Sequence, residues 1–183
     1  MASGRRGQVA WFSPDPRGVL PLDGFHVPRS LRKRVRRGDY RVTFDEAFDA
    51  VIHQCAAPRA YERQTWINDD IIAAFGQLHR AGLAHSVEAW QDDAEGDAPP
   101  RLVGGLYGVA LAGAFFGESM FSRATDASKV CLVHLVNHLR ERGFVLLDTQ
   151  FFNSHLMQFG VEEIRRDEFL DRLEHALTLD VRW

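Results

Sequence analysis

The chain has 183 residues, of which 45% are apolar and 26% are charged, a balance typical of a globular domain with one sizeable core. Its formal net charge is −3, so any attraction to nucleic acid must come from local clusters of basic residues. No apolar run approaches the roughly 18 residues of a membrane span. The two cysteines, Cys55 and Cys131, form no spaced motif, so we expect reduced core thiols in a cytoplasmic protein.

The first part of the chain predicts an extended segment, a short helix and a short strand. Residues 11–24, WFSPDPRGVLPLDG, are rich in Pro, Gly and Asp, which is typical of an extended stretch broken by turns. Residues 28–38, PRSLRKRVRRG, predict a short helix that ends at Gly38. The strand YRVT follows, and we expect Thr43 to begin the next helix with Glu46 as its partner in a capping box.

The middle of the chain predicts two helices and three antiparallel strands. Apolar residues at positions 44, 47, 48, 51, 52 and 55 give the first helix its buried face. The second helix is expected to begin near Asn68 and to stop at Gly82. The segment AHSVEAW, residues 84–90, predicts a strand, and LVGGLYGVAL with AFFGESMF predicts a hairpin that turns at Ala112 and Gly113.

The last part of the chain predicts a helix, a strand and a final helix. The first of these helices is expected from about Asp126 to Arg142, and the segment GFVLLDTQFFNSH, residues 143–155, predicts a buried strand. The final helix, RRDEFLDRLEHAL, is expected to bury Phe169, Leu170, Leu173 and Leu177.

Polar residues interrupt this otherwise apolar strand. Because successive side chains of a strand point to opposite faces, Asp148 and Gln150 are expected on the same side, roughly 6.5 Å apart. A buried carboxylate is costly unless it is paired or hydrogen-bonded. The pair is therefore either a satisfied feature of the core or a reaction site.

The order of elements predicts an α+β fold. Two helices, three antiparallel strands, a helix, a strand and a helix resemble the GCN5-related acetyltransferase fold, a mixed, mostly antiparallel sheet flanked by helices. In that fold, the strands before and after the central helix splay apart and hold the reacting groups between them. We expect residues 1–27 to form an extended N-terminal segment and residues 28–183 to form the acetyltransferase-like domain.

One feature argues against coenzyme A as the acyl donor. An acetyl-CoA enzyme of this fold needs a glycine-rich turn before the central helix, whose N–H groups cradle the pyrophosphate. Here the junction is SRATDASKV, which has no glycine, and Asp126 would repel a pyrophosphate. We therefore expect a different acyl donor in the cleft.

Several segments together resemble one family, the bacterial leucyl/phenylalanyl-tRNA–protein transferases. The resemblance covers roughly residues 11–175, and its most specific combination is WFSPDPR with GESMFSR and LDTQ. The remaining segments are YRVT, TWI, AHSVEAW, GGLYGVA, ASK, FFNSH and EEIRRDEFL. Family members usually carry a further small segment ahead of WFSPDPR, so this chain is expected to be an N-terminally shortened member.

The resemblance implies transfer of leucine or phenylalanine from an aminoacyl-tRNA to the N-terminal arginine or lysine of a protein, which is then degraded through the N-degron pathway. The ester of an aminoacyl-tRNA is already activated, so we expect no cofactor, ATP or metal. The expected partners are Leu-tRNA, Phe-tRNA and proteins with a basic N-terminus. We expect a cytoplasmic monomer without a membrane span.

The resemblance implies that Asp148 and Gln150 are catalytic. Asp148 would orient and polarise Gln150, and the amide oxygen of Gln150 would accept a hydrogen from the attacking amine. A carboxamide is a poor base, so Asp148 is either the proton acceptor or an electrostatic anchor. The alternative without the resemblance is a buried aspartate satisfied by backbone amides.

The resemblance also implies a binding site for the aminoacyl side chain. It places the aminoacyl side chain in an apolar pocket, and such a pocket is expected to admit methionine as well. Its members are Leu106, Phe115, Met120, Leu135, Leu139 and Leu147. Glu118 and Asn153 would hold the basic N-terminus of the acceptor, although Glu118 could equally be a strand-end carboxylate that faces solvent.

Two tryptophans and one basic segment are the candidates for contacts with tRNA. By resemblance, Trp11 and Trp66 would stack on the terminal adenosine, although partly buried tryptophans are also common in cores. If residues 28–38 are helical, four basic side chains share one face and suit tRNA phosphates, although such a run is often only solvated. These four are Arg29, Lys33, Arg36 and Arg37.

Two histidines lie four residues apart on the helix expected from about Asp126 to Arg142. His134 and His138 are spaced as in a zinc protease, but Leu135 stands where the catalytic glutamate would be, so no metal is expected.

A non-catalytic binder of aminoacyl-tRNA or of basic N-termini is the main alternative to the transferase, and a small-molecule acetyltransferase is the second. Retention of both Asp148 and Gln150 favours the transferase.

Overall fold

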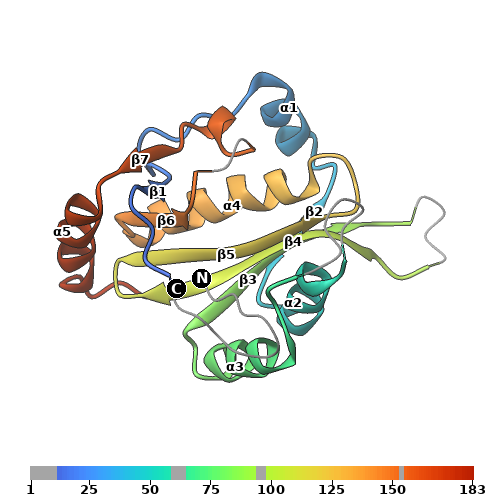
Figure 1. Ribbon diagram of the computed structural model, residues 1–183. Helices are drawn as coiled ribbons and strands as arrows, with labels where there is room; N and C mark the ends of the chain where they lie inside the picture. The colour runs from blue at the N-terminus through green and yellow to red at the C-terminus, as the bar shows by residue number, and fades with distance from the viewer. Residues whose placement is uncertain (1–11, 59–64, 94–97, 153–154) are drawn as a thin grey trace.

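A mixed seven-stranded sheet organises the described part of the chain, in the order β2-β3-β4-β5-β6-β1-β7. The computed structural model describes residues 12–58, 65–93, 98–152 and 155–183 (Figure 1). All paired strands are antiparallel except β5 and β6. The strands are β1 Arg17–Val19, β2 Arg41–Phe44, β3 Ala84–Gln91, β4 Arg101–Leu111, β5 Ala114–Ser122, β6 Leu146–Gln150 and β7 Glu162–Ile164.

Five α-helices of the described ranges cover both faces of the sheet (Figure 1). The helices α1 and α4 share a hydrophobic cluster with one face, whereas α2 and α3 pack on the other face with Tyr107 and Phe121. The helix α5 packs on that second face too, against β5 and β6. The helices are α1 Arg29–Arg37, α2 Phe48–Ala56, α3 Asp69–Arg80, α4 Ala127–Arg142 and α5 Arg166–Leu177.

The expected α+β class is confirmed, and so are most of the expected elements. The helix α1 is followed by Gly38, whose φ of 68° is left-handed. The helix α3 begins after Asn68, whose side chain accepts a hydrogen bond from the Ile71 N–H at 2.9 Å. The hairpin of β4 and β5 turns at Ala112 and Gly113. No helix in the described residues combines the length and the apolar composition needed to cross a bilayer.

The predicted capping box is wrong, because a distant carboxylate takes its threonine. Thr43 lies in β2, and its hydroxyl donates to the buried Glu88 on β3 at 2.6 Å. The pairing of β2 with β3 extends through Phe44, so the following helix, α2, begins only at Phe48. The capping signature was outweighed by the need of Glu88 for a donor.

The predicted inner face of α5 is partly wrong. Leu170 and Leu177 are 52% and 46% exposed. Phe169 and Ala176 are buried, and Leu173 packs beside them. These positions are spaced i, i+4 and i+7, so α5 presents a narrow stripe to the sheet, and Leu170 and Leu177 lie outside it.

Two three-residue strands were not predicted. Residues 11–24 were expected to be extended, but not to join the sheet, and β7 was not expected at all. The strand β1 pairs with β6 on one side and with β7 on the other. The WFSPDPRGVL region therefore supplies a strand beside LLDTQ, although the two segments are far apart in sequence.

The close packing of α4 on β4 depends on Gly104. A Cβ at this position would lie 2.5 Å from the Ala127 Cβ and 2.8 Å from the Ala127 carbonyl carbon. We predict that Gly104→Ala lowers the free energy of unfolding by about 1–3 kcal/mol, because α4 must shift to admit the methyl group. Urea denaturation of the purified protein measures this change.

Gly76→Ala is the matched control for this prediction. Gly76 lies inside α3, and the nearest atom to its added methyl group is Nη1 of the flexible Arg80 side chain at 3.6 Å. The control is expected to gain up to about 1 kcal/mol from better helix propensity. Wild-type stability in Gly104→Ala would contradict the close approach of α4.

Candidate functional site

Asp148 is fully buried, and its carboxylate is held by an arginine that the sequence analysis did not single out. Arg17 of β1 donates from Nε to Oδ1 at 2.9 Å and from Nη2 to Oδ2 at 2.5 Å, a bidentate ion pair. The backbone N–H of Gln150 also donates to Oδ1, at 2.9 Å. The two oxygens therefore accept three hydrogen bonds, and the desolvated charge is compensated.

Gln150 departs from regular strand geometry. Its φ is 59°, in the left-handed region, which costs a residue other than glycine free energy. The N–H of Phe151 donates to the Thr149 carbonyl at 2.7 Å, so the chain turns tightly at this point. Gln150 is 8% exposed. The expectation that Asp148 and Gln150 project from the same side assumed regular strand geometry, which Gln150 does not have.

The neighbouring strand β1 has a glycine, Gly18, beside this turn. Gly18 pairs with Gln150, and the register between β1 and β6 is irregular at this position. A Cβ on Gly18 would lie 2.8 Å from the Phe151 carbonyl carbon and 2.9 Å from the Thr149 Oγ1. A glycine is thus required beside the turn, because the backbone of residue 151 crosses where a side chain would stand.

A β-bulge places Glu118 near this site. In the β4–β5 ladder, Tyr107 pairs with Ser119 while the next residue, Gly108, pairs with Gly117, so Glu118 has no partner on β4. A bulge changes which side chains point to which face, and bulges occur frequently beside active sites. The sequence pattern identified Glu118 as an isolated acid but gave no sign of the bulge.

Glu118 is half-buried, and its charge interacts with the Arg17–Asp148 pair. Burial raises the pKa of Glu118, the Asp148 carboxylate raises it further, and Arg17 opposes both effects. Among the described residues, Glu118 takes part in no ion pair. The hydroxyl of Tyr107, which is buried without a hydrogen-bond partner in the described part of the chain, also interacts with Glu118.

The sheet opens next to these residues. The parallel pairing of β5 with β6 covers only three positions and ends where Phe116 meets Asp148. Beyond that point, β5 continues to Ser122, whereas Gln150 at the end of β6 pairs with β1. The two strands that flank α4 in sequence therefore separate at the level of Glu118 and Gln150.

The structure brings the six predicted pocket residues together in or against one hydrophobic cluster. Leu106 and Met120 face each other across β4 and β5, and Phe115 faces Leu147 across β5 and β6. The α4 residues Leu135 and Leu139 belong to the same cluster. All except Met120 are at most 3% exposed.

Opposite faces of the sheet carry the apolar and the charged residues. Leu147 packs towards α4, whereas its neighbour Leu146 packs towards α5, so Asp148 belongs to the α5 face. Phe115 and Met120 both face α4 although they are five residues apart. This is possible because the bulge at Glu118 adds one residue between them.

The predicted adenosine-stacking and acceptor residues are only partly described. Trp66 is half-buried and packs at the edge of the α2–α3 cluster, on the same face as Asp148. Trp11 and Asn153 lie outside the described residues.

Three of the four predicted tRNA-binding residues on α1 are exposed and form no ion pair with described residues: Arg29, Lys33 and Arg36. Arg37 is also exposed, but it donates from Nε and Nη2 to Asp39 at 3.0 Å and 2.6 Å. Asp126, which precedes α4, pairs with Lys129 at 2.9 Å and with Arg34 of α1 at 3.5 Å. A carboxylate thus stands at the N-terminus of α4, which disfavours a bound pyrophosphate.

His138 of α4 packs against aromatic residues, and His134 of the same helix is half-buried. The ring of His138 lies 4.8 Å from Phe44 and 4.5 Å from Trp183, and burial lowers the pKa of both His134 and His138. Within the described ranges, no three His, Cys, Asp or Glu side chains are arranged to hold a metal ion.

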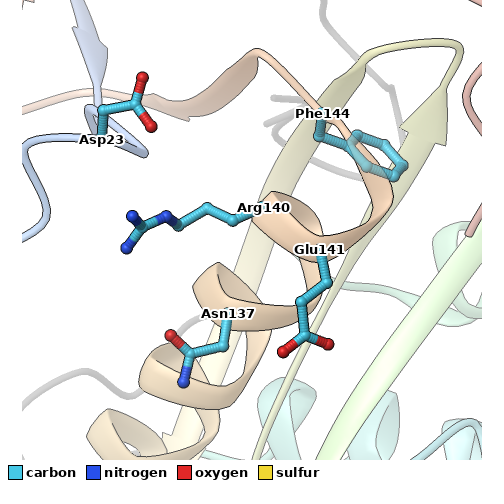
Figure 2. A pocket seen from close by; sticks show the side chains of 5 residues that line it. All are labelled: Asp23, Asn137, Arg140, Glu141 and Phe144. Atoms are coloured by element: carbon cyan, nitrogen blue, oxygen red, sulfur yellow. The ribbon is translucent and has the colours of Figure 1, made fainter.

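A separate surface hollow lies at the C-terminal end of α4 (Figure 2). None of the predicted site residues lines it. Its polar side chains point in different directions and do not converge on one position, so we assign it no function. The lining residues are Asp23, Asn137, Arg140, Glu141 and Phe144.

Comparison with known proteins identifies the family. Residues 19–174 match the model of the family described as "Leucyl/phenylalanyl-tRNA protein transferase". The family that it matches is one of aminoacyltransferases by class. More specifically, it belongs to the leucyl/phenylalanyl-tRNA protein transferase family.

Similar proteins from three bacteria carry the same name, leucyl/phenylalanyl-tRNA–protein transferase. The one from Hyphomonas neptunium is 57% identical over 90% of this chain, and the alignment spans 61% of its own length. Those from Paramagnetospirillum magneticum and Rubrobacter xylanophilus are 54% and 56% identical over 93% and 97% of this chain, and 78% and 88% of their own lengths. The solved structure of L-PGS from Bacillus licheniformis is 12% identical over 78% of this chain and 49% of its own, with a TM-score of 0.47.

The raised pKa of Glu118 predicts how stability depends on pH. Below the pKa of glutamate in the unfolded chain, Glu118 is protonated in both states. As the pH rises, the unfolded state ionises first, so the wild type loses stability up to the pKa of the folded state. Glu118→Gln cannot ionise, so its melting temperature relative to wild type is expected to increase from pH 4.5 to 8.

Calorimetry across this pH range measures the difference. Glu174→Gln, at an exposed position on α5, controls for loss of one negative charge. A stability difference between Glu118→Gln and wild type that is independent of pH would contradict the buried-acid interpretation.

Proposed function

We propose that this chain transfers leucine or phenylalanine, and also methionine, from aminoacyl-tRNA to the N-terminal arginine or lysine of acceptor proteins. The product carries one additional residue and is marked for degradation through the N-degron pathway. The observation that carries the proposal is the family match over residues 19–174, within which Asp148 and Gln150 form one hydrogen-bonded turn. We further propose that the protein acts in the cytoplasm as a monomer.

We propose that residues 28–183 form an aminoacyltransferase domain with a GCN5-related acetyltransferase-like fold, and that residues 1–27 are an N-terminal segment that adds strand β1 to its sheet. The separation of β5 and β6 after α4 supports this proposal, because splayed strands flanking the central helix define that fold. The carboxylate of Asp126 at the start of α4 supports an acyl donor other than coenzyme A.

The reaction is aminolysis of an activated ester. The α-amine of the acceptor attacks the carbonyl carbon, a C–N bond forms, the ester C–O bond breaks, and the ribose oxygen leaves with a proton. A free α-amine has a pKa near 8, so only modest assistance is needed at neutral pH, and much of the rate can come from positioning. No cofactor, ATP or metal is required by this chemistry.

Asp148 and Gln150 have different roles in this mechanism. The Gln150 carboxamide oxygen accepts a hydrogen bond from the attacking amine and orients it. Asp148 acts as an anchor and not as the proton acceptor, because its side chain is fully buried and three donors already occupy its oxygens. The left-handed φ of Gln150 supports a functional role, because such strain is found mostly at sites where it serves one.

The aminoacyl side chain enters where β5 and β6 separate and lies against the apolar cluster. Met120, the half-exposed member, stands at the entrance, and the buried residues form the walls. All are hydrocarbon or thioether side chains, as a leucine or phenylalanine substrate requires. The walls are Leu106, Phe115, Leu135, Leu139 and Leu147.

Acceptor and tRNA contact residues complete the proposed site. Glu118, a carboxylate without an ion pair in the described residues, receives the basic N-terminus of the acceptor together with Asn153. Trp66 on the α2–α3 side and Trp11 stack on the terminal adenosine. The exposed face of α1 contacts tRNA phosphates through Arg29, Lys33, Arg36 and Arg37.

A non-catalytic binder of aminoacyl-tRNA or of basic N-termini is the second candidate. It would show the same tRNA affinity but no transfer. Incubation of the protein with labelled Leu-tRNA and a peptide that begins with arginine separates the two functions. Peptide labelling is expected, and tRNA retention without transfer would contradict the proposed reaction.

Gln150→Ala tests the chemical step. We predict that kcat falls about 100-fold, near the lower end of the contribution of a positioned acid–base group, while the melting temperature stays close to wild type. Gln77→Ala, on the exposed side of α3, is the matched control and should keep full activity. A fully active Gln150→Ala would remove Gln150 from the mechanism.

Charge reversal on α1 tests the tRNA contact. The triple variant Arg29→Glu, Lys33→Glu and Arg36→Glu is expected to bind tRNA more weakly and to reduce the salt slope of log Kd by about 2–3, because each phosphate contact contributes about one. The control reverses three exposed arginines elsewhere: Arg80, Arg172 and Arg182. Equal tRNA affinity in both triple variants would refute a specific role for α1.

A further inference from the structure

Arg17 joins three parts of the molecule that are far apart in sequence. It lies in β1 between β6 and β7, with Ile164 of β7 as its pairing partner. Its side chain is 12% exposed and binds Asp148 with two parallel hydrogen bonds. On α5, the ring of Phe169 lies 4.4 Å from the Arg17 guanidinium carbon, close enough for a cation–π contact.

The orientation of the Asp148 carboxylate is fixed by this contact. A bidentate guanidinium holds both carboxylate oxygens in one plane, which a single ammonium group does not do. Oδ1 is thereby presented to the Gln150 N–H at 2.9 Å. Because Asp148 has no exposed surface, it cannot contact a substrate directly and acts through neighbouring residues such as Gln150.

The Gln150 backbone needs this support. A glutamine with a φ of 59° relaxes to a right-handed or extended conformation unless its surroundings prevent it. Relaxation would change the direction in which the carboxamide points. The described contacts that oppose it are the Asp148 Oδ1 bond and the close backbone approach at Gly18.

We propose that Arg17 is a positioning residue of the transferase, with the ring of Phe169 as its support. Arg17 orients Asp148, Asp148 holds Gln150 in its left-handed conformation, and Gln150 presents its carboxamide to the acceptor amine. This inference rests on the proposed function for its catalytic meaning. The positions of Arg17, Asp148 and Gln150 support the structural part of the inference whether or not the proposed function is correct.

Arg17→Lys is the principal test, because it keeps the positive charge but cannot make the bidentate contact. Steady-state transfer from Leu-tRNA to an Arg-initiated peptide is expected to show kcat lowered about 10- to 100-fold, with the KM for both substrates within twofold of wild type. Arg172→Lys, at the exposed Arg172–Glu168 pair of α5, is the matched control and should match wild type. Wild-type kcat in Arg17→Lys would overturn the proposal.

A double-variant cycle separates positioning from general support of the fold. If Arg17 acts through Asp148, then Arg17→Met lowers kcat in the wild-type background but causes no further loss in the Asp148→Asn background. A merely structural arginine would lower the stability and the active fraction of the variants but not kcat per folded molecule. Additive losses of kcat would therefore overturn the proposal.

A measurement that needs no activity separates failure of this inference from failure of the proposed function. Hydrogen exchange of the Gln150 backbone N–H, followed by NMR, reports the hydrogen bond of this group to Asp148 in any folded variant. Exchange is expected to accelerate at least 10-fold in Arg17→Lys, while the Val145 amide, which donates to the Gly113 carbonyl, stays protected.

Unchanged Gln150 protection in Arg17→Lys would overturn the proposal even if the wild type is active. Conversely, lost protection in the variant together with an inactive wild type would refute the proposed function and leave the structural role of Arg17 intact. If Arg17→Met does not fold, Arg17→Lys and Phe169→Leu provide the same exchange measurement, and Phe169→Leu is expected to accelerate it less than Arg17→Lys does.

Discussion

The buried ion pair of Arg17 with Asp148 determines how the end of β6 is built. A carboxylate without solvent contact must be matched by donors, and here two come from one guanidinium and one from the Gln150 backbone. That third donor reaches the carboxylate while residue 150 is left-handed. The hydrogen bond to the buried Asp148 carboxylate thus helps to hold the strained turn at Gln150 in place. The strand β1 contributes because it supplies Arg17, which pairs with the same carboxylate.

The separation of β5 and β6 joins two chemically different faces of the sheet. Apolar residues gather on the face covered by α4, while Asp148 and its arginine lie on the face covered by α5. A substrate in an unbroken sheet could reach only one of these environments. Since strand pairing stops at Phe116 and Asp148, an ester placed at the separation could have its side chain among hydrocarbons and its carbonyl beside polar groups.

The sequence predicted elements well and their long-range partners poorly. The hairpin, the stop at Gly38 and the start at Asn68 depend on neighbouring residues, so local patterns were sufficient. Asp148 and Gln150 stood out in LLDTQ as polar residues in an apolar run, and the structure joins them by a hydrogen bond. Arg17 was missed because it lies 131 residues from Asp148, and the bulge at Glu118 was missed because it depends on register.

Buried acids explain both why Arg17 was not predicted and why the predicted helix start at Thr43 is wrong. Glu88 is fully buried, burial raises its pKa, and it draws hydroxyl donors from Ser86 and from Thr43, 45 residues away. Thr43 was predicted to cap a helix because its own neighbours form a capping signature. A desolvated carboxylate binds whichever donors the fold places next to it. Leaving it without donors costs more free energy than the roughly 1 kcal/mol that a helix cap contributes. Buried acids such as Asp148 and Glu88 are therefore the positions at which local patterns should be trusted least.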